Sequence, residues 1–197
     1  MKKLFVLWAV CVCFSFKTSN ADFEQDYVDT QQIESLIVKR LNEIRAQKEL
    51  SVLTENTILK KAADDQARYI SNKGSLSHSQ PSKAKEKTRN RVEYYGGKMQ
   101  GIGENTAYLK VFGRALFKGK EGQIDTVNIN TVDRAVDYFV YAWMNSVPHK
   151  TNILYPDYSE TGLKVIYNKQ RKALYGVQVF AYPYKWKSSV DVFGFWC

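Results

Sequence analysis

Apolar side chains recur at helical spacing in three segments of this chain, and that periodicity constrains the fold more than any other feature. The segments run over residues 31–48, 55–74 and 132–146, and each presents one apolar stripe to a core. Their expected N-terminal capping residues are Asp29 or Thr30, Thr54 and Thr131, and Gly74 is expected to end the second. The third must stop near Ser146, because a residue before proline, here Val147, avoids helical geometry.

Alternation replaces helical spacing in the last third of the chain. Leu163, Val165 and Tyr167 alternate with their neighbours, residues 168–172 form a polar turn, and residues 174–182 are mostly apolar, which together predict an antiparallel hairpin. The aromatic segment 184–196 is expected to pack back on that sheet. Helices followed by strands in a chain of 197 residues favour one α+β sandwich domain.

Two long connections separate these elements. Residues 75–93 are polar, so we expect a loop with a short helix near 89–95. The basic side chains of residues 83–91 are expected to be solvated rather than to bind nucleic acid, because no nucleic-acid module accompanies them. Residues 110–130 contain three glycines and are expected to form a long loop or a hairpin insertion.

The first 21 residues have the features of a secretory signal. Two lysines precede an apolar stretch, and Ser19, Asn20 and Ala21 supply a cleavage site before Asp22. Cleavage would leave a single domain of residues 22–197 in which the last residue, Cys197, is the one cysteine. No later apolar run is long enough to span a membrane. We therefore expect a secreted protein, or a periplasmic or cell-envelope protein, of bacterial type.

The chain contains only two histidines, and both follow predicted helices. His78 comes after the second helix and His149 after the third, while Glu104 lies between them in a segment bounded by glycines. Two imidazoles and a carboxylate supply three ligands to a divalent metal and leave one position open. The same groups can also transfer protons, or hydrogen-bond locally and order the loops. Spacing alone does not decide among these interpretations.

Other catalytic signatures are missing from the sequence. It contains neither the Gly-x-Ser-x-Gly motif of serine hydrolases nor the His-Glu-x-x-His motif of zinc proteases. The pair Gly101 and Gly103 lacks the rest of a dinucleotide-binding motif. No catalytic residue is therefore assigned, and His78, Glu104 and His149 are the candidates.

Five short motifs follow one another in a fixed order along the chain. They are Ser77-His78-Ser79, Gly103-Glu104-Asn105, the segment from Trp143 to Leu154, Gly162, and Gln178-Val179-Phe180. Together with the segment from Leu41 to Arg45, they resemble the bacterial branch of the CAP superfamily, which is also called SCP-like. That superfamily is named after cysteine-rich secretory proteins, antigen 5 and pathogenesis-related 1 proteins. The resemblance covers residues 33–182.

The resemblance implies a three-layer α-β-α sandwich with a central antiparallel sheet, in which His78, Glu104 and His149 line one cleft. In many members two histidines and two acidic residues form a tetrad that holds zinc or magnesium. The second acid commonly lies just after the tryptophan of the third helix. This chain has no carboxylate in residues 144–146, so one expected metal ligand is missing.

Three hypotheses follow from the residues and the resemblance together. The first is an exported binding module that takes a small or extended ligand, either lipid, glycan or peptide, with or without a divalent metal such as Zn²⁺ or Mg²⁺. The second is a metal-assisted hydrolase, such as a peptidase. The third is a structural role, in which His78, Glu104 and His149 only order the loops. The first is preferred, because the tetrad is incomplete; whether the protein is an enzyme stays open.

Overall fold

The computed structural model describes residues 27–118 and 124–184 of the 197-residue chain. Its elements are α1 (Thr30–Ala46), β1 (Thr54–Glu55), α2 (Thr57–Lys73), the 3-10 helix η1 (Lys83–Lys85), α3 (Thr88–Tyr94), β2 (Met99–Lys110), β3 (Arg114–Lys118), β4 (Ile124–Asn128), α4 (Val132–Met144), α5 (Val147–Ile153), β5 (Glu160–Asn168) and β6 (Ala173–Pro183). The predicted signal, Cys197 and the aromatic tail beyond Tyr184 lie outside the described residues. Within the described ranges, no helix has the length and apolar character needed to cross a membrane.

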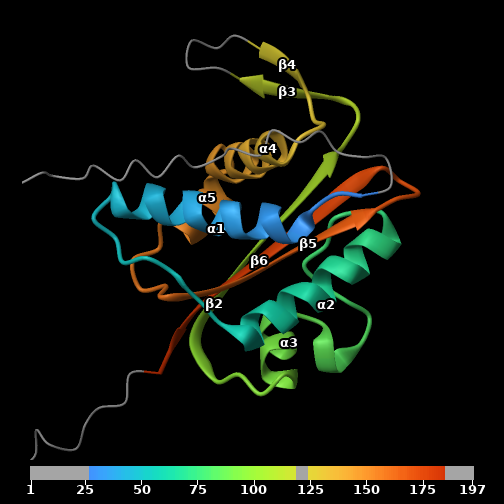
Figure 1. Ribbon diagram of the computed structural model, residues 1–197. Coiled ribbons are helices and arrows are strands. Elements are labelled where there is room, and N and C mark those ends of the chain that lie inside the picture. Colours follow the sequence, from blue (N-terminus) through green and yellow to red (C-terminus); the bar gives the residue numbers. More distant parts are fainter. Residues whose placement is uncertain (1–26, 119–123, 185–197) are drawn as a thin grey trace, which may run out of the picture.

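A four-stranded sheet in the order β1-β5-β6-β2 forms the middle layer. Strands β5 and β6 are antiparallel, as are β6 and β2, whereas the short β1 runs parallel to β5. The predicted C-terminal hairpin is therefore confirmed as β5 and β6. The insertion at residues 110–130 contains a second hairpin, β3 and β4, which projects away from the main sheet (Figure 1).

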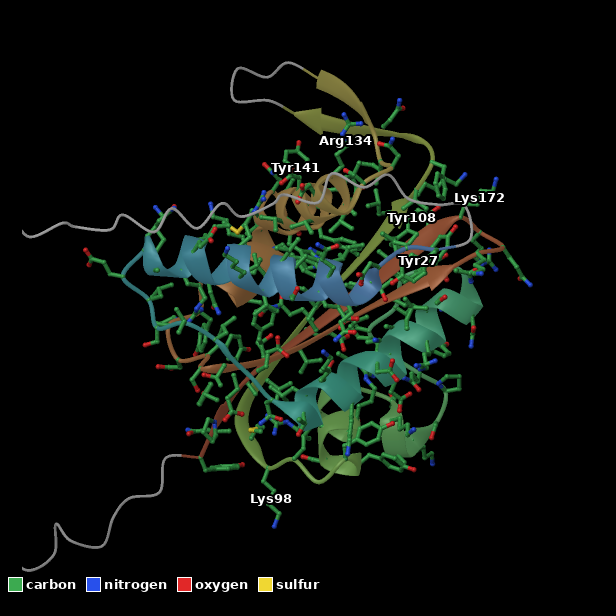
Figure 2. All side chains as sticks on the ribbon, viewed as in Figure 1. Tyr27, Lys98, Tyr108, Arg134, Tyr141 and Lys172 are labelled. Carbon is green, nitrogen blue, oxygen red and sulfur yellow. The ribbon has the colours of Figure 1, made fainter. Side chains whose placement is uncertain are left out.

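Helices cover both faces of the sheet (Figure 1). One core packs α1, α4 and α5 against the sheet, and the other packs α2 and α3 against its opposite face. The central strand β6 serves both cores, since successive side chains of a strand point to opposite faces. Its Leu174 and Phe180 belong to the first core, and Val177 and Val179 to the second. Side chains fill the space on both sides of the sheet (Figure 2), so the predicted three-layer sandwich is confirmed.

The helical periodicities locate the three long helices correctly. Asp29 caps α1 by accepting a hydrogen bond of 2.8 Å from the Gln32 backbone N–H. Thr131 caps α4, and Gly74 ends α2 with φ of 77°, a backbone conformation that favours glycine. The expected cap of α2 is wrong. Thr54 belongs to β1, and Asn56 caps the helix instead.

Strands β1 and β2, the 3-10 helix η1 and the short helix α5 are not predicted by the sequence, and one prediction about side chains fails. Strand β2 and the short helix α5 have no clear periodicity, although they carry Glu104 and His149. The basic segment 83–91 is not wholly solvated. Arg91 has no exposed surface, and Lys85 pairs with Asp65 at 2.6 Å.

Candidate functional site

Strand β2 places Glu104 inside the molecule, opposite Val179 of β6. Glu104 is followed by two more buried polar residues, and buried polar groups require hydrogen-bond partners. The preceding Gly103 makes room for those partners. A Cβ atom at Gly103 would come within 2.8 Å of Asn152 Oδ1 and 2.6 Å of the Tyr158 hydroxyl. Glycine at this position therefore allows α5 and the following segment to approach the strand closely.

The Glu104 carboxylate links the side chains of Arg91 and His78. Arg91 Nη2 donates to Glu104 Oε2 at 2.6 Å, and His78 Nδ1 lies 2.8 Å from Glu104 Oε1. The Glu104 side chain is only 3% exposed and that of Arg91 is completely buried, whereas that of His78 is 57% exposed. Both carboxylate oxygens are thus engaged, and the imidazole is the member of this chain that faces solvent.

Arg91 also holds the loop that carries His78. Its Nη1 donates to the backbone carbonyl of Lys85 at 3.0 Å and to that of Glu86 at 3.2 Å. Gln66, which is fully buried on α2, donates to the Ser77 carbonyl next to His78. Buried donors from α2 and α3 therefore fix the backbone on both sides of the imidazole.

His149 is positioned by a pair of amide side chains. Asn105 Nδ2 donates to the His149 carbonyl at 3.1 Å, and Asn152 Nδ2 donates to Asn105 Oδ1 at 2.8 Å. Asn152 Nδ2 also reaches the Glu104 carbonyl at 3.3 Å. These contacts attach the short helix α5 to β2 directly beside Glu104.

The two imidazoles have opposite electrostatic environments. The hydrogen bond with Glu104 raises the pKa of His78, although burial acts against this effect. Burial lowers the pKa of His149, and the nearby positive charge of His78 lowers it further. At the same pH, His78 therefore carries a proton more readily than His149. Of the two rings, His78 is therefore the better hydrogen-bond donor and His149 the better acceptor.

The contacts engage part of the donor set that the resemblance implies for a metal, but they leave His78 Nε2 open. Glu104 already binds Arg91 with one oxygen and His78 with the other, and His78 uses Nδ1 in that contact. In residues 27–118 and 124–184, no group of three or more His, Cys, Asp or Glu side chains is arranged to hold a metal ion. The assignment of His78, Glu104 and His149 as metal ligands therefore stays a prediction, and no cofactor is established.

A groove of about 460 Å³ lies against α5. It is lined by Val147, Lys150, Thr151, Leu154, Tyr155 and Pro156. Val147 is 79% exposed, so this helix presents an apolar side chain to solvent two residues before His149. The groove and the imidazole thus belong to the same short helix.

Sequence reasoning misses Arg91, the residue that neutralises Glu104. Its basic neighbours at positions 83–89 make it look like part of a solvated charged segment. One signal was available: Thr88, Arg91, Val92 and Tyr95 share helical spacing, which places the arginine on the same helix face as the fully buried Val92.

Comparison with known proteins is consistent with this architecture. The sequence profile of the cysteine-rich secretory protein family, CAP, matches residues 38–180. The structure is similar to an outer surface protein of Borrelia burgdorferi, with a TM-score of 0.61, 17% identity, and coverage of 80% of this chain and 97% of that chain.

Two further solved structures share the fold. One is an extracellular protein of Bacillus anthracis str. Ames that contains an SCP domain (TM-score 0.57, 18% identity, 78% of this chain and 41% of that chain). The other is a cysteine-rich secretory protein of Staphylococcus aureus subsp. aureus Mu50 (TM-score 0.53, 16% identity, 78% and 39%). No curated protein sequence gives a match. The profile match spans most of the chain, and the protein therefore belongs to the cysteine-rich secretory protein (CAP) family.

Proposed function

We propose that this protein is an exported CAP-domain binding module, and that His78, Glu104 and His149 hold the polar part of a lipid, glycan or peptide ligand. Export is supported by the signal-like residues 1–21 and by the similar proteins, which are described as outer-surface, extracellular and secretory. Binding, rather than catalysis, is the function that the side-chain geometry supports best.

One observation carries the proposal: Arg91 and His78 hold Glu104 through both of its oxygens, while the His78 ring remains open to solvent. Each oxygen of this carboxylate accepts one hydrogen bond, so Glu104 is held in a fixed position beside the imidazole. An exposed imidazole with one fixed nitrogen is a directed hydrogen-bonding group, because its Nε2 is available to a ligand. Ordered, partly exposed polar groups of this kind fix the orientation of ligands.

The groove on α5 supports a ligand that is longer than a single polar group. Its volume of about 460 Å³ lies within the range of small-molecule sites, roughly 300–1,000 Å³. The exposed Val147 and the ring of Tyr155 give it apolar walls, and Lys150 adds one cation. Residues 147, 150, 151 and 154 share one face of α5 and residue 149 lies on another, so a ligand that uses both features must extend around this helix.

No specific observation favours the metal-assisted hydrolase. The second carboxylate is missing from residues 144–146, and the first is engaged by Arg91. The third hypothesis, a structural role for the two histidines, predicts that their removal lowers stability by about 1–3 kcal/mol and changes no binding.

A thermal-shift screen of the chain from residue 22 tests the proposal. Phospholipids and fatty acids, cell-wall glycan fragments, and short peptides form the three ligand classes. We expect one class to raise the melting temperature, and we expect the double variant His78→Ala, His149→Ala to abolish that shift. Glu93→Ala, which changes an exposed residue on α3, is the matched control and should keep the shift. If no class stabilises the wild type, the proposal fails.

Calorimetric titration with Zn²⁺ separates the proposal from the metal-assisted alternative. We expect no stoichiometric binding of zinc that depends on His78 and His149. Tight zinc binding by the wild type that disappears in the double histidine variant would overturn the proposal in favour of a metal site.

A further inference from the structure

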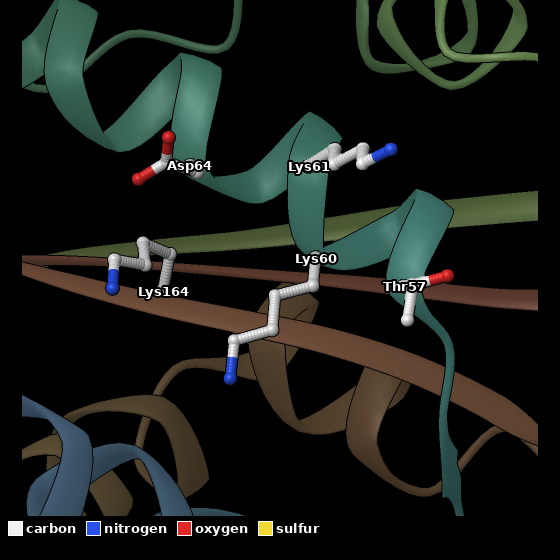
Figure 3. Close-up of a pocket in the computed structure, with 5 residues that line it drawn as sticks. All are labelled: Thr57, Lys60, Lys61, Asp64 and Lys164. Carbon is white, nitrogen blue, oxygen red and sulfur yellow. The ribbon is translucent and has the colours of Figure 1, made fainter.

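A pocket of about 270 Å³ lies between α2 and β5, and it shares no lining residue with the site at His78 (Figure 3). Thr57, Lys60, Lys61 and Asp64 of α2 form one wall, and Lys164 of β5 forms the other. Three of the five lining residues are therefore cationic. Asp64, the single acid among them, pairs with Arg68 at 2.8 Å through Oδ2, whereas its Oδ1 has no hydrogen-bond partner among the described residues.

The lysines meet because α2 approaches β5 unusually closely at Gly162. A Cβ atom at this glycine would lie 2.1 Å from the backbone nitrogen of Lys60, which leaves no room for any other residue. The first turns of α2 therefore rest directly on the strand. Lys60 and Lys164, more than a hundred positions apart in sequence, extend into the same space (Figure 3).

A single buried carboxylate lies behind the two lysines. Glu34 of α1, only 4% exposed, is 3.2 Å from Lys60 Nζ through Oε2 and 3.1 Å from Lys164 Nζ through Oε1. Its Oε1 also accepts a hydrogen bond of 3.0 Å from the Val165 backbone N–H. Glu34 thus holds both ammonium groups in place but neutralises only one of the two charges.

Both ammonium groups keep donors beyond those that Glu34 uses. An ammonium has three N–H donors. Among the contacts of the described residues, Lys164 uses one, and Lys60 uses a second on Glu55 at a long 3.9 Å. The first turn of α2 contains no acidic residue, so the partial positive charge of the helix N-terminus is not offset there.

We propose that this pocket binds a phosphate group, held by Lys60 and Lys164 with Lys61 at the rim. A phosphate is a compact anion with several acceptor oxygens, and it matches three ammonium groups, of Lys60, Lys61 and Lys164, which the carboxylates of Glu34 and the more distant Glu55 offset only in part. The volume of the pocket admits a phosphate with a small substituent, such as glycerol phosphate or the headgroup of a phospholipid. The inference is independent of the proposed function at His78.

Calorimetric titration of the folded chain with inorganic phosphate at low ionic strength tests the site. We expect one bound phosphate in the wild type. Lys164→Met should weaken binding about tenfold or more, because it removes one charge-assisted contact. Glu34→Gln should tighten binding, since it removes the carboxylate that competes for both lysines and keeps an oxygen for Val165. Lys98→Met, which changes an exposed lysine that points away from the body (Figure 2), is the control.

Three results would overturn the proposal. The first is the absence of phosphate binding in the wild type. The second is an equal loss in Lys98→Met and Lys164→Met, which would indicate nonspecific attraction to a cationic protein. The third is phosphate binding by the Glu34→Gln variant but not by the wild type. This result would show that Glu34 keeps both lysines occupied in the native protein. Circular dichroism of each variant verifies that it is folded.

Two arms of the experiment distinguish the sources of the phosphate. Glycerol 3-phosphate represents a soluble phosphate ester, and vesicles of phosphatidylglycerol represent an anionic lipid surface, with phosphatidylcholine vesicles as the control. If Lys164→Met weakens the binding of glycerol 3-phosphate but not of phosphatidylglycerol vesicles, the ligand is a soluble ester. If it weakens the binding of phosphatidylglycerol vesicles, the ligand is a lipid headgroup.

Discussion

Arg91 carries a full charge at a position without solvent, and its partner Glu104 is almost as deeply buried. Removing one partner of a buried ion pair leaves the other charge uncompensated, which costs more than the pair itself contributes. We therefore expect Arg91→Met to lower the free energy of unfolding by about 3–5 kcal/mol. Urea unfolding measured by circular dichroism gives this value.

A double-mutant cycle separates the charge from the packing of the arginine. Glu104→Gln in the Arg91→Met background should restore part of the lost stability, because the orphaned carboxylate is then neutral. Arg89→Met is the matched control: Arg89 is exposed and donates only to backbone carbonyls of residues 99 and 100. A cost for Arg91→Met no greater than that for Arg89→Met would contradict the expected role.

The His78 contact should contribute to stability in a pH-dependent way. The hydrogen bond to Glu104 raises the pKa of His78 in the folded protein. Its contribution is therefore fully present below about pH 6.5, the ordinary value, and is lost as the pH rises through the folded-state pKa. Because the side chain is 57% exposed, solvent screening keeps the effect under about 1 kcal/mol.

Unfolding of wild type and His78→Gln between about pH 5 and pH 9 measures this contribution. The stability difference should shrink as the pH rises. His149→Gln provides the opposite control: burial lowers the pKa of His149, so the wild type loses stability at low pH by comparison with this variant. The same pH trend in both variants would show that the two rings do not differ as described.

At the scale of elements, the contact of α2 with β5 depends on the missing side chain of Gly162. A methyl group there would meet the backbone of Leu59 and Lys60, which cannot rotate away. We expect Gly162→Ala to lower the free energy of unfolding by about 3 kcal/mol through overpacking. Gly113→Ala is the matched control, since no atom lies within 4 Å of its Cβ position. Thermal unfolding of both variants measures the difference, and similar losses would contradict the close-contact argument.

The elements that the sequence predicts are those whose burial follows their own periodicity. Helices α1, α2 and α4 bury regular stripes, and β6 is a mostly apolar run that is buried on both faces, so local patterns locate these elements. Strand β2 is different, because glycines and the buried polar residues 104–106 break its alternation, and its pairing with the distant β6 defines it. Helix α5 has only seven residues and is held by Asn105 and Asn152 rather than by its own propensity.

The candidate site is predicted only in part, because local motifs contain some of its residues and tertiary packing decides the rest. The motifs contain His78, Glu104 and His149, and the structure brings the first two into direct contact. The charge balance around them depends on Arg91, whose burial results from tertiary packing of α3 against α2 and β2. The motif residues alone leave a metal site, proton transfer and a structural role open, whereas the contacts show a carboxylate that is paired with a buried arginine.

At the scale of the whole molecule, the two cores are joined by one strand. Strand β6 supplies Leu174 and Phe180 to the core under α1 and α4, and Val177 and Val179 to the core under α2. Neither helical layer can leave the sheet without exposing apolar side chains of this strand. The sandwich should therefore unfold as one cooperative unit rather than layer by layer.

Truncations in the two cores test this cooperativity. Ile70→Ala in the α2 core should cost about 2–5 kcal/mol, and Phe139→Ala in the α4 core about 3–5 kcal/mol, since both side chains are fully buried. In each variant, urea transitions followed by far-UV circular dichroism and by tryptophan fluorescence should shift together and stay coincident. Val52→Ala, at a position 55% exposed, should stay within about 0.5 kcal/mol of wild type. A variant in which the two probes report separate midpoints would show that the layers unfold independently despite their common strand.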